Sequence, residues 1–407
     1  MTKIPATISD LTPQIMTALL AEKQPGIVVE NVEITEHAQC GDGLASTADR
    51  VGLKLQYKEG SNTAGLPENM KLKTILLHRF LRFGMPMIIG TAKVVNMLEK
   101  IPLLGRLSGP FVFTLINIYQ RYFPHAPEAM YRNEVNFYGK LRDEVDIEAP
   151  ACYASVMNES DGQFCILMED LSLRSARFPN AIGGVSLEEM RSLVGELAKL
   201  HAHYWQSPRL DKDLAWLPKT WEDGMFPVFD AIGLNIIRDQ VAKNLFKQEL
   251  LAPLDRTVDQ LWDANWKSQK MIYQQPHTLL HGDTHIGNTY VLPDGEGGLL
   301  DFQLMVRGPW CHDFSYLVIT GLDIEVRRKH EKELLALYCE TLAAHGVKNV
   351  PSADEAFLLY RQSAIWGLVI GWLITPPQNY GEQITSANIH KMVTAMMDLK
   401  TLESLQA

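Results

Sequence analysis

The pattern of apolar and polar residues predicts that the first part of the chain is rich in strands. Strands are expected at 27–35, 48–57, 70–77, 151–157 and 164–168. Ahead of them, Thr12 and Pro13 are typical of an N-cap followed by a proline at the first helical position. Residues 14–23 are therefore expected to form a helix that precedes the strands.

After residue 168 the apolar positions recur at helical spacing. Ser186 and Glu189 form a capping box, which begins a helix that continues to residue 205. Further helices are expected at 223–247, 258–273, 323–344, 353–374 and 384–402. The apolar stretch 365–374 is only about half as long as a membrane span, so we expect a buried helix. Its two glycines, Gly367 and Gly371, allow close packing.

A hairpin is predicted near residue 290, and polar side chains stand at both of its ends. It consists of two short apolar runs and a turn rich in glycine, at 289–292, 299–302 and 293–297, respectively. Asn288 begins the first strand and Asp301 ends the second. The hairpin therefore brings these two side chains close together.

These residue types suit phosphoryl transfer from ATP. A carboxylate must orient and deprotonate the accepting hydroxyl, and an amide oxygen with a second carboxylate must hold Mg²⁺ against the phosphates. Asp283 lies five residues before Asn288 in a glycine-flanked loop, from which it can face both Asn288 and Asp301. This spacing matches the Asp-x-x-x-x-Asn catalytic loop of protein kinases, and Asp301 opens an Asp-Phe-Gln triplet where those enzymes have Asp-Phe-Gly.

Two histidines extend this pattern. His281 and His285 complete a His-Gly-Asp-x-His-x-x-Asn motif, which resembles the signature of the aminoglycoside phosphotransferase and choline kinase superfamily. The phrase Leu-Ala-x-Leu-His-Ala-x-x-Trp at 197–205 is most similar to the ecdysteroid kinase-like branch of that superfamily. The resemblance implies an α+β, bilobal, protein-kinase-like fold. Its small antiparallel-sheet lobe, 1–168, would bind ATP, and its mostly helical lobe, 169–407, would hold the catalytic loop and the substrate site.

The resemblance also implies roles for the residues around the hairpin. Asp283 would accept the proton of the hydroxyl, and Asn288 and Asp301 would hold Mg²⁺. The two histidines of the motif would support the loop. Asp313 stands in a Gly-x-x-x-x-Asp segment and would brace the catalytic loop without taking part in the chemistry.

The nucleotide site is expected in the small lobe. Lys73 matches the strand-borne lysine of the family, which grips the α- and β-phosphates, and Lys71 on the same strand face is the alternative. Glu134 lies on an apolar helix face, where a carboxylate needs a cationic partner, and it opens the family's Glu-x-x-Phe-Tyr phrase. Further nucleotide contacts are expected from a glycine-rich turn and from a hinge that meets the adenine, at Gly41, Gly43, Ser46, Met168, Glu169 and Asp170.

The composition of the chain limits the kinds of binding partner and the cellular compartment that we expect. The chain has 407 residues and a net charge of −10, and it shows no basic stripe, which disfavours nucleic acid as a partner. Five scattered cysteines without a Cys-x-x-Cys motif indicate reduced thiols and a cytoplasmic protein. The N-terminus lacks the apolar core of a signal peptide. No protein partner is indicated.

The stretch 76–121 does not fit a minimal small lobe. It holds two apolar helix candidates, and we interpret it as an insertion that packs on the small lobe or covers the cleft. Charged residues interrupt it, so no stable membrane insertion is expected; they are Lys93, Glu99, Lys100 and Arg106.

The sequence therefore predicts an ATP-dependent kinase that phosphorylates a hydroxyl of a small molecule. The acceptor is expected to be apolar, because the helical lobe offers Tyr360, Trp366 and Trp372 among aliphatic residues. One alternative is a catalytically silent nucleotide-binding protein of the same fold. Another is a metal-dependent hydrolase, in which His281, Asp283 and His285 would bind zinc with help from His312.

Overall fold

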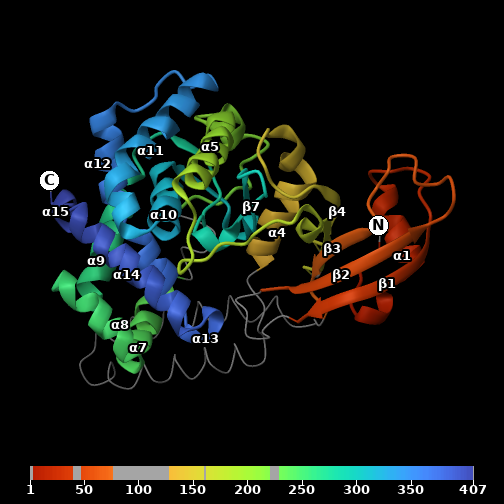
Figure 1. Cartoon of the computed structure of the whole chain (residues 1–407), viewed down its shortest axis with the longest axis horizontal. Coiled ribbons are helices and arrows are strands. Elements are labelled where there is room, and N and C mark those ends of the chain that lie inside the picture. The colour runs from red at the N-terminus through yellow and green to blue at the C-terminus, as the bar shows by residue number, and fades with distance from the viewer. Residues whose placement is uncertain (1–2, 40–46, 77–127, 160–161, 221–228, 407) are drawn as a thin grey trace. The chain divides into compact units, whose positions relative to one another are not determined.

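The computed structural model describes residues 3–39, 47–76, 128–159, 162–220 and 229–406. These residues form two compact units (Figure 1). The first unit contains the described residues up to 76, then 128–144 and Ala149–Ser175. The second contains Val145–Glu148 and the described chain from Ala176 on. The predicted nucleotide-binding turn with Gly41, Gly43 and Ser46 lies outside the described residues, as does the predicted insertion after residue 76.

An antiparallel sheet forms the centre of the first unit. Its strands are β1 (Val29–Ala38), β2 (Asp49–Tyr57), β3 (Asn69–Thr74), β4 (Cys152–Met157) and β5 (Phe164–Glu169). They lie in the order β1-β2-β3-β5-β4, and every predicted strand is confirmed with ends that differ by a few residues. The predicted lobe boundary after residue 168 falls inside β5, and the first unit continues to Ser175.

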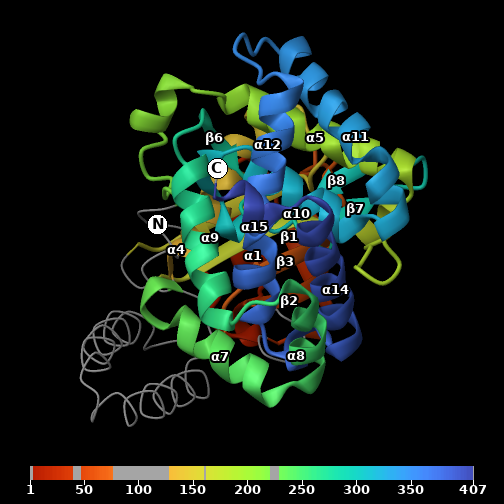
Figure 2. The ribbon, with the colours of Figure 1, turned by 90° about the vertical axis from the view of Figure 1, so that its left-hand side faces the viewer.

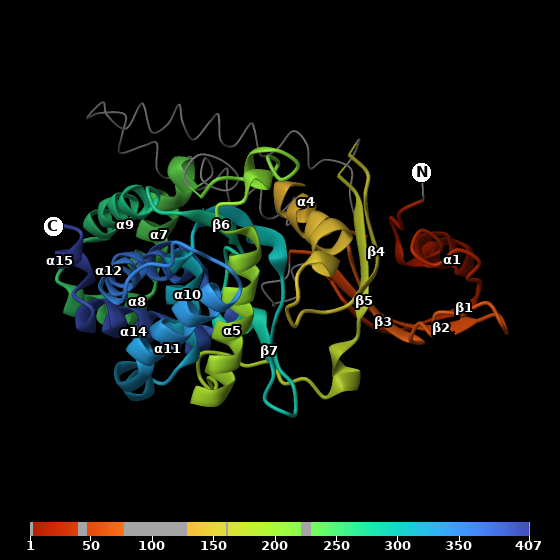
Figure 3. The same ribbon diagram turned by 90° about the horizontal axis from the view of Figure 1, so that it is seen from above.

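Helices cover both faces of this sheet (Figure 3). On one face, α1 (Pro13–Ala21) packs its apolar side into a core with β1, β2 and β3. The predicted cap is present, because the Thr12 hydroxyl accepts a hydrogen bond from the Ile15 N–H at 3.4 Å. On the other face lies α4 (Glu128–Asn136), which continues into a π-helical turn, Phe137–Leu141.

The buried face of α4 and its π-helical turn agrees with the sequence pattern. Glu134, Phe137, Tyr138 and Leu141 are each at most 1% exposed. Tyr131, one turn before Glu134, stacks its ring on Phe164 of β5 with 4.5 Å between ring centroids. An apolar and aromatic surrounding therefore encloses the Glu134 carboxylate, and this raises the energetic need for a cationic partner.

The second unit is mostly helical. Its longer helices are α5 (Leu187–Tyr204), α7 (Leu234–Lys243), α8 (Leu245–Leu251), α9 (Val258–Ile272), α10 (Cys311–Gly321), α11 (Ile324–Ala344), α12 (Ala353–Ser363) and α14 (Glu382–Asp398). The predicted capping box of Ser186 and Glu189 forms at the start of α5. Side by side, α5 and α11 run along one part of the unit (Figure 2). Sheet in one unit and helices in the other confirm the predicted α+β class.

Three of the predicted helices are interrupted. The prediction at 223–247 lies outside the described residues up to 228, and its described part is divided at Asn244, whose extended backbone separates α7 from α8. The prediction at 353–374 consists of α12 and a following π-helix, Gly367–Leu373. The prediction at 384–402 ends at Asp398, because Lys400 adopts a left-handed backbone before the short α15 (Thr401–Ser404). Periodicity located these helices but did not predict their breaks.

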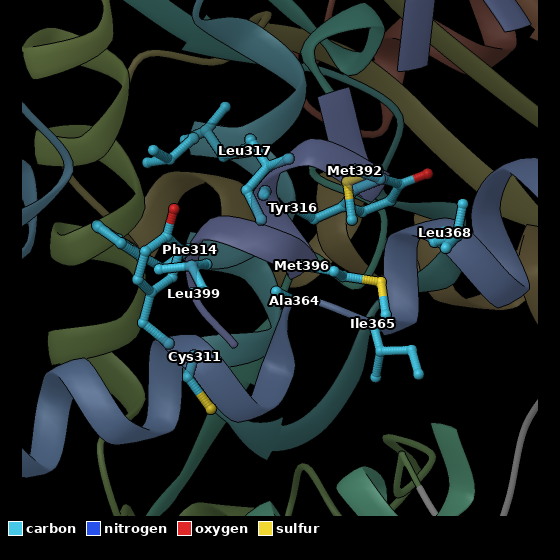
Figure 4. Close-up of a cluster of buried hydrophobic side chains, with 14 of the residues drawn as sticks. Cys311, Phe314, Tyr316, Leu317, Ala364, Ile365, Leu368, Met392, Met396 and Leu399 are labelled. Atoms are coloured by element: carbon cyan, nitrogen blue, oxygen red, sulfur yellow. The ribbon is translucent and has the colours of Figure 1, made fainter. Parts of the chain in front are cut away.

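A large apolar core holds the second unit together, and α10 is buried along its whole length. Figure 4 shows side chains of α10 among those of Ala364 and Ile365, which follow α12, of Leu368 in the π-helix, and of Met392 and Met396 in α14. A Cβ atom at Gly367 or Gly371 would lie 2.6 or 2.2 Å from the Tyr316 side chain. These glycines therefore allow the close packing that the sequence predicts.

The helical stretch Ala353–Leu373, which comprises α12 and the following π-helix, is long and apolar enough to cross a membrane. In the folded chain, 72% of its most apolar window is buried inside the protein. It packs in the core of the second unit, as predicted for the apolar stretch 365–374. Among the described residues it is the one helix that meets these criteria.

Candidate active site

The predicted catalytic loop connects two small two-stranded sheets in the second unit. β6 (His277–Leu280) pairs with β9 (Val306–Pro309), and β7 (Thr289–Val291) pairs with β8 (Gly297–Leu299). The loop therefore starts at the end of β6 and finishes at the start of β7. Strand pairing anchors both of its ends.

The predicted hairpin is present, but Asp301 does not end its second strand. β8 ends at Leu299, and Asp301 follows with φ 62° and ψ 69°, a left-handed conformation that ends the extended chain. Leu300 N–H still donates to the Asn288 carbonyl oxygen at 2.9 Å. The hairpin thus brings Asn288 next to the residue before Asp301. The prediction about the strand end was wrong because periodicity carries no signal for one left-handed residue.

Asn288 holds Asp283 directly. Its side-chain Nδ2 donates to the Asp283 main-chain oxygen at 2.8 Å and to the carboxylate Oδ2 at 3.0 Å. The Asp283 side chain keeps 27% of its surface exposed. Burial raises the pKa of Asp283 to about 7, and the negative charges of Asp301 and Asp313 act in the same direction against His281 and Asn288. A carboxylate in this state can accept a proton near neutral pH.

His281 fastens the loop to the hairpin. Its ring Nε2 lies 2.6 Å from the Leu300 carbonyl oxygen, and its Nδ1 accepts the Asp283 N–H at 3.3 Å. The ring also packs against Phe302 at 4.7 Å between centroids. Both ring nitrogens are therefore used in positioning the loop.

His285 has a similar structural role closer to the carboxylate. Its Nδ1 accepts the Gly287 N–H at 3.1 Å, so its Nε2 carries the proton and lies 3.9 Å from Asp283 Oδ2. Burial lowers the pKa of His285 to about 4, which keeps the ring neutral. Its ring meets Trp372 and Tyr380 edge-on, at 5.4 and 5.9 Å between centroids.

These contacts give the zinc-hydrolase alternative no support. Both nitrogens of His281 and the Nδ1 of His285 already bond to the protein. His312 bonds to the main chain instead of completing a ligand set. Within the residues that the structure describes, no group of three or more His, Cys, Asp or Glu side chains is arranged to hold a metal ion.

Asp313 braces the loop, which is the function its sequence context implies. Its carboxylate is fully buried and accepts the main-chain N–H groups of His281 at 2.7 Å and Gly282 at 3.0 Å. It also bonds to the His201 ring at 3.1 Å. Burial alone would raise the pKa of Asp313, but the hydrogen bond from His201 and the nearby histidines outweigh it and lower the pKa.

His201 is a site residue that sequence reasoning did not assign. It comes from α5, within the Leu-Ala-x-Leu-His-Ala-x-x-Trp phrase, and is fully buried. Its second ring nitrogen bonds to the Tyr338 hydroxyl at 2.6 Å. The phrase that carried the family resemblance therefore also supplies the support for Asp313, and a histidine inside it was the available signal.

Gly282 is required by the geometry of the loop. It has φ +82°, and a Cβ atom there would lie 2.0 Å from the Leu304 main-chain oxygen. No side chain fits between these two backbone segments. The Gly-Asp pair of the motif thus reflects close contact between the loop and the chain before β9.

In the first unit, Lys73 and Glu134 form the predicted pair. Lys73 Nζ lies 2.8 Å from Glu134 Oε1 and 2.7 Å from Oε2. Both residues are buried, at 7% and 1% exposure. Lys71 is more exposed, and it pairs with Glu36 and lies 3.7 Å from Asp170. Of the two candidate lysines, the structure therefore places Lys73 in the pair with Glu134.

The predicted hinge residues follow at the end of β5. Met168 pairs with Lys71 across the sheet. Glu169 accepts the Ala151 N–H at 3.2 Å, and Asp170 caps the next helical turn by accepting the Ser172 N–H at 3.0 Å. Their carboxylates are engaged in local structure. Any contact with an adenine would therefore come from the main chain of this segment.

The donor set near Asp283 fits a hard divalent cation. Because Asn288 turns its amide nitrogen to Asp283, its side-chain oxygen is the end that remains for another ligand. Asp301 is near enough to Asp283 for its charge to raise the pKa of that residue, and a cation would relieve this repulsion. Mg²⁺ is usually held by one or two side-chain oxygens together with phosphates and water.

A buried lysine–glutamate pair and a loop in which an asparagine holds an aspartate are the features of a kinase-like phosphotransferase. The chain belongs to the ecdysteroid kinase-like family, whose family model matches residues 114–349, more than half of the chain. The match includes Glu134 and the whole loop, whereas Lys73 lies before it. Family membership supports the general class of small-molecule phosphotransferase. No functionally curated protein matches the chain in sequence.

Solved structures with a similar chain course include several small-molecule kinases. A microcompartment-associated aminopropanol kinase shares 14% identity, with 96% of this chain and 98% of that chain covered and a TM-score of 0.46. A spectinomycin phosphotransferase, solved with ADP and spectinomycin, shares 13% identity over 96% and 98% of the chains, with a TM-score of 0.45. An ethanolamine kinase from Plasmodium vivax shares 11% identity over 89% and 81%, with a TM-score of 0.42.

Proposed function

We propose that this protein transfers the γ-phosphoryl group of ATP to a hydroxyl of a small, largely apolar molecule. The observation that carries the proposal is the hold of Asn288 on Asp283, at 2.8 and 3.0 Å. It places a partly exposed carboxylate, with a pKa raised to about 7, beside oxygen donors suited to Mg²⁺. Membership of the ecdysteroid kinase-like family supports the same class.

In the proposed reaction, Asp283 orients the acceptor hydroxyl and takes its proton. The hydroxyl oxygen forms a bond to the γ-phosphorus while the bond from that phosphorus to the β–γ bridging oxygen breaks, and ADP leaves. Burial of most of the Asp283 surroundings strengthens the bond to the incoming hydroxyl. His281 and Asp313 keep the loop rigid, so the carboxylate is in place before the substrate arrives.

Three side chains would bind the nucleotide and its metal, and Glu134 would position one of them. Asn288 and Asp301 are suited to bind Mg²⁺, which when bound would neutralise phosphate charge as the γ-phosphoryl group is transferred. Lys73 would grip the α- and β-phosphates. Glu134 keeps the lysine ammonium extended through contacts of 2.7 and 2.8 Å, so little conformational freedom is lost when phosphate binds.

The apolar character of the acceptor now rests on fewer residues than the sequence indicated. Tyr360 is fully buried and bonds to Glu331, and Trp372 is 2% exposed, so these two aromatic rings pack in the core. Trp366 is only half-buried, and its ring meets those of Phe229 and Trp266, each at 6.2 Å between centroids. These three rings offer an apolar surface of the kind that binds an aromatic or alicyclic alcohol.

An acceptor screen tests the proposal. Purified protein with Mg-ATP is offered aminoglycosides, choline and hydrophobic alcohols at equal concentration, and phosphorylated products are read by mass spectrometry. We expect preferential phosphorylation of a hydrophobic alcohol, and loss of at least about 100-fold in turnover for Asp283→Asn. Preferential turnover of an aminoglycoside or of choline would contradict the apolar acceptor.

A binding measurement beside this assay distinguishes an active enzyme from a catalytically silent nucleotide-binding protein. Binding of Mg-ATP is measured by calorimetry for the wild type and for Asp283→Asn, which keeps the size of the side chain. Nucleotide binding by both proteins without turnover of any acceptor would favour a catalytically silent nucleotide-binding protein. Turnover by the wild type alone, with ATP binding by both, is the result expected for an enzyme.

A further inference from the structure

His312 carries a buried ring nitrogen that the proposed chemistry does not use. The residue follows Cys311 at the start of α10 and is 2% exposed. Its Nε2 lies 3.3 Å from the Gly282 carbonyl oxygen. Its Nδ1 has no hydrogen-bond partner among the described residues. Buried polar atoms are rarely left unpaired in a folded protein, so this nitrogen calls for a partner.

The bond to Gly282 decides what kind of partner this is. A carbonyl oxygen only accepts hydrogen bonds, so Nε2 must carry the ring proton. Burial lowers the pKa of His312 and keeps the ring neutral. Nδ1 is then a bare acceptor, and its partner must be a donor.

The surroundings of His312 point to the acceptor side of the site. Gly282 directly precedes Asp283, so the ring is bonded to the catalytic loop itself. On its other side the ring packs against Trp366 at 4.9 Å between centroids. Trp366 is half-buried and belongs to the aromatic surface that it forms with Phe229 and Trp266. The His312 ring therefore contacts both the loop that carries the candidate base and one ring of this apolar surface.

We infer that His312 Nδ1 accepts a hydrogen bond from a second hydroxyl of the acceptor molecule, whose apolar body packs on Trp366. This rests on the proposed function. The hydroxyl that reacts cannot be the donor to His312, because its single proton goes to Asp283. An ammonium donor is disfavoured, since a neutral ring would not compensate the burial of its charge. The substrate class is thus an apolar molecule with at least two hydroxyls.

Three matched probes test this subsite in binding. They are 1,4-benzenedimethanol, its monomethyl ether and 4-(aminomethyl)benzyl alcohol, which share one benzylic hydroxyl and differ in the second group. Dissociation constants are measured calorimetrically with the full chain in the presence of Mg-ADP. We expect the diol to bind about three- to tenfold more tightly than the ether, the gain of one neutral hydrogen bond. Tighter binding of the amine than of the diol would overturn the assignment to a hydroxyl.

Two variants separate the two nitrogens of His312. In His312→Asn the amide oxygen can stand near the Nδ1 position, whereas in His312→Gln the amide nitrogen can replace Nε2 toward Gly282. The preference for the diol should persist in His312→Asn and vanish in His312→Gln. Equal affinity of the wild type for diol and ether, no detectable binding of either, or an unchanged preference in His312→Gln would overturn the inference.

The experiments distinguish failure of the proposed kinase activity from failure of the proposed hydroxyl subsite. The binding measurements do not depend on phosphoryl transfer, so a diol preference without any turnover would leave this subsite standing and count against the kinase activity. Affinity for the ether and for Mg-ADP, together with the melting temperature, reports whether each variant is folded. A variant that keeps these and loses only the diol preference has lost the contact at Nδ1.

Discussion

Lys73 Nζ lies within 2.8 Å of both carboxylate oxygens of Glu134, and both residues are buried. One residue comes from β3 and the other from α4, so the pair joins the sheet to the helix on its face. Removing a partner from a buried pair leaves an uncompensated charge. The arrangement therefore affects both nucleotide binding and stability, and the two effects can be measured separately.

The first prediction concerns the choice between two lysines. Lys73→Ala should raise the KM for ATP or lower kcat by at least about tenfold, because the phosphates lose their cationic contact. Lys71→Ala is the matched control on the same strand. It should change either constant by less than about threefold, because its partly exposed side chain pairs only at the surface. Steady-state kinetics with the acceptor found in the screen would decide, and the opposite ranking would contradict the assignment.

The second prediction concerns stability. Glu134→Leu alone should lower the free energy of unfolding of the first unit by about 3–5 kcal/mol, because Lys73 would remain charged and buried. The double variant Glu134→Leu with Lys73→Met should recover most of that loss, since it replaces the pair with apolar side chains. Urea denaturation of the wild type, the single variants Glu134→Leu and Lys73→Met, and the double variant gives the coupling energy. Additive losses would show that the pair makes no net contribution.

The third prediction concerns Asp301. Asp301→Ala should abolish the dependence of ATP affinity on Mg²⁺, because a hard cation loses its carboxylate oxygen. Calorimetric titration of ATP with and without Mg²⁺ measures this dependence. Asp294, an exposed aspartate in the turn of the same hairpin, serves as control, and Asp294→Ala should keep the wild-type response. An unchanged metal dependence in Asp301→Ala would exclude Asp301 as a ligand.

The fourth prediction uses two glycines with similar backbones. Gly282 and Gly295 have φ +82° and +92°, but a Cβ atom at Gly282 would lie 2.0 Å from Leu304 O, whereas none of the described atoms lies within 4 Å at Gly295. Gly295→Ala should cost about 1 kcal/mol in unfolding free energy and keep activity. Gly282→Ala should cost several-fold more in stability, and turnover should fall by about 100-fold or more as the loop shifts. Comparable effects at both sites would contradict the close contact.

The fifth prediction concerns pH. Burial acts to raise the pKa of Asp313, but the hydrogen bond from His201 and the nearby histidines hold this pKa below the ordinary value of about 4 in the folded protein. The group therefore stabilises the fold above about pH 4 and loses this contribution as the pH falls below that value. Asp313→Asn should remove that acid-dependent part and lower the unfolding free energy at pH 7 by about 3 kcal/mol, through the bonds from His201 and the loop. Urea denaturation between pH 3 and 7 measures both. Parallel stability curves for the two proteins would contradict the role of Asp313.

Much of the local structure followed from the sequence. Thr12 and Ser186 capped the helices that were expected after them, and every predicted strand of the first unit is present. The buried face of Glu134, Phe137 and Tyr138 was also correct. These features depend on residues within about two turns of each other, and such short-range preferences are encoded in the local pattern.

Other features could not be predicted from the sequence because each depends on the backbone conformation of a single residue. Asp301 leaves the strand through a left-handed conformation, and Asn244 interrupts a helix that periodicity would continue. A single polar residue fits the hydropathy pattern of a continuing strand or helix, so neither residue signals the break. Of the three aromatic residues expected to face the acceptor, Tyr360 and Trp372 are buried in the core and Trp366 is half-buried. Periodicity does not say which aromatic residue of a helix reaches the surface.

The motif around Asp283 and Asn288 was readable in the sequence because its members are five residues apart and their spacing alone suggests the chemistry. The family resemblance favoured Lys73 and left Lys71 as the alternative, and the tertiary structure shows the pairing, because Glu134 lies 61 residues away and contacts Lys73. The support of Asp313 by His201, 112 residues apart, and the unpaired nitrogen of His312 needed it too. The local sequence pattern indicates where helices, strands and short motifs form. Which polar side chains meet across more than 60 residues of chain is decided by tertiary packing. The same packing leaves His312 Nδ1 without a hydrogen-bond partner among the described residues.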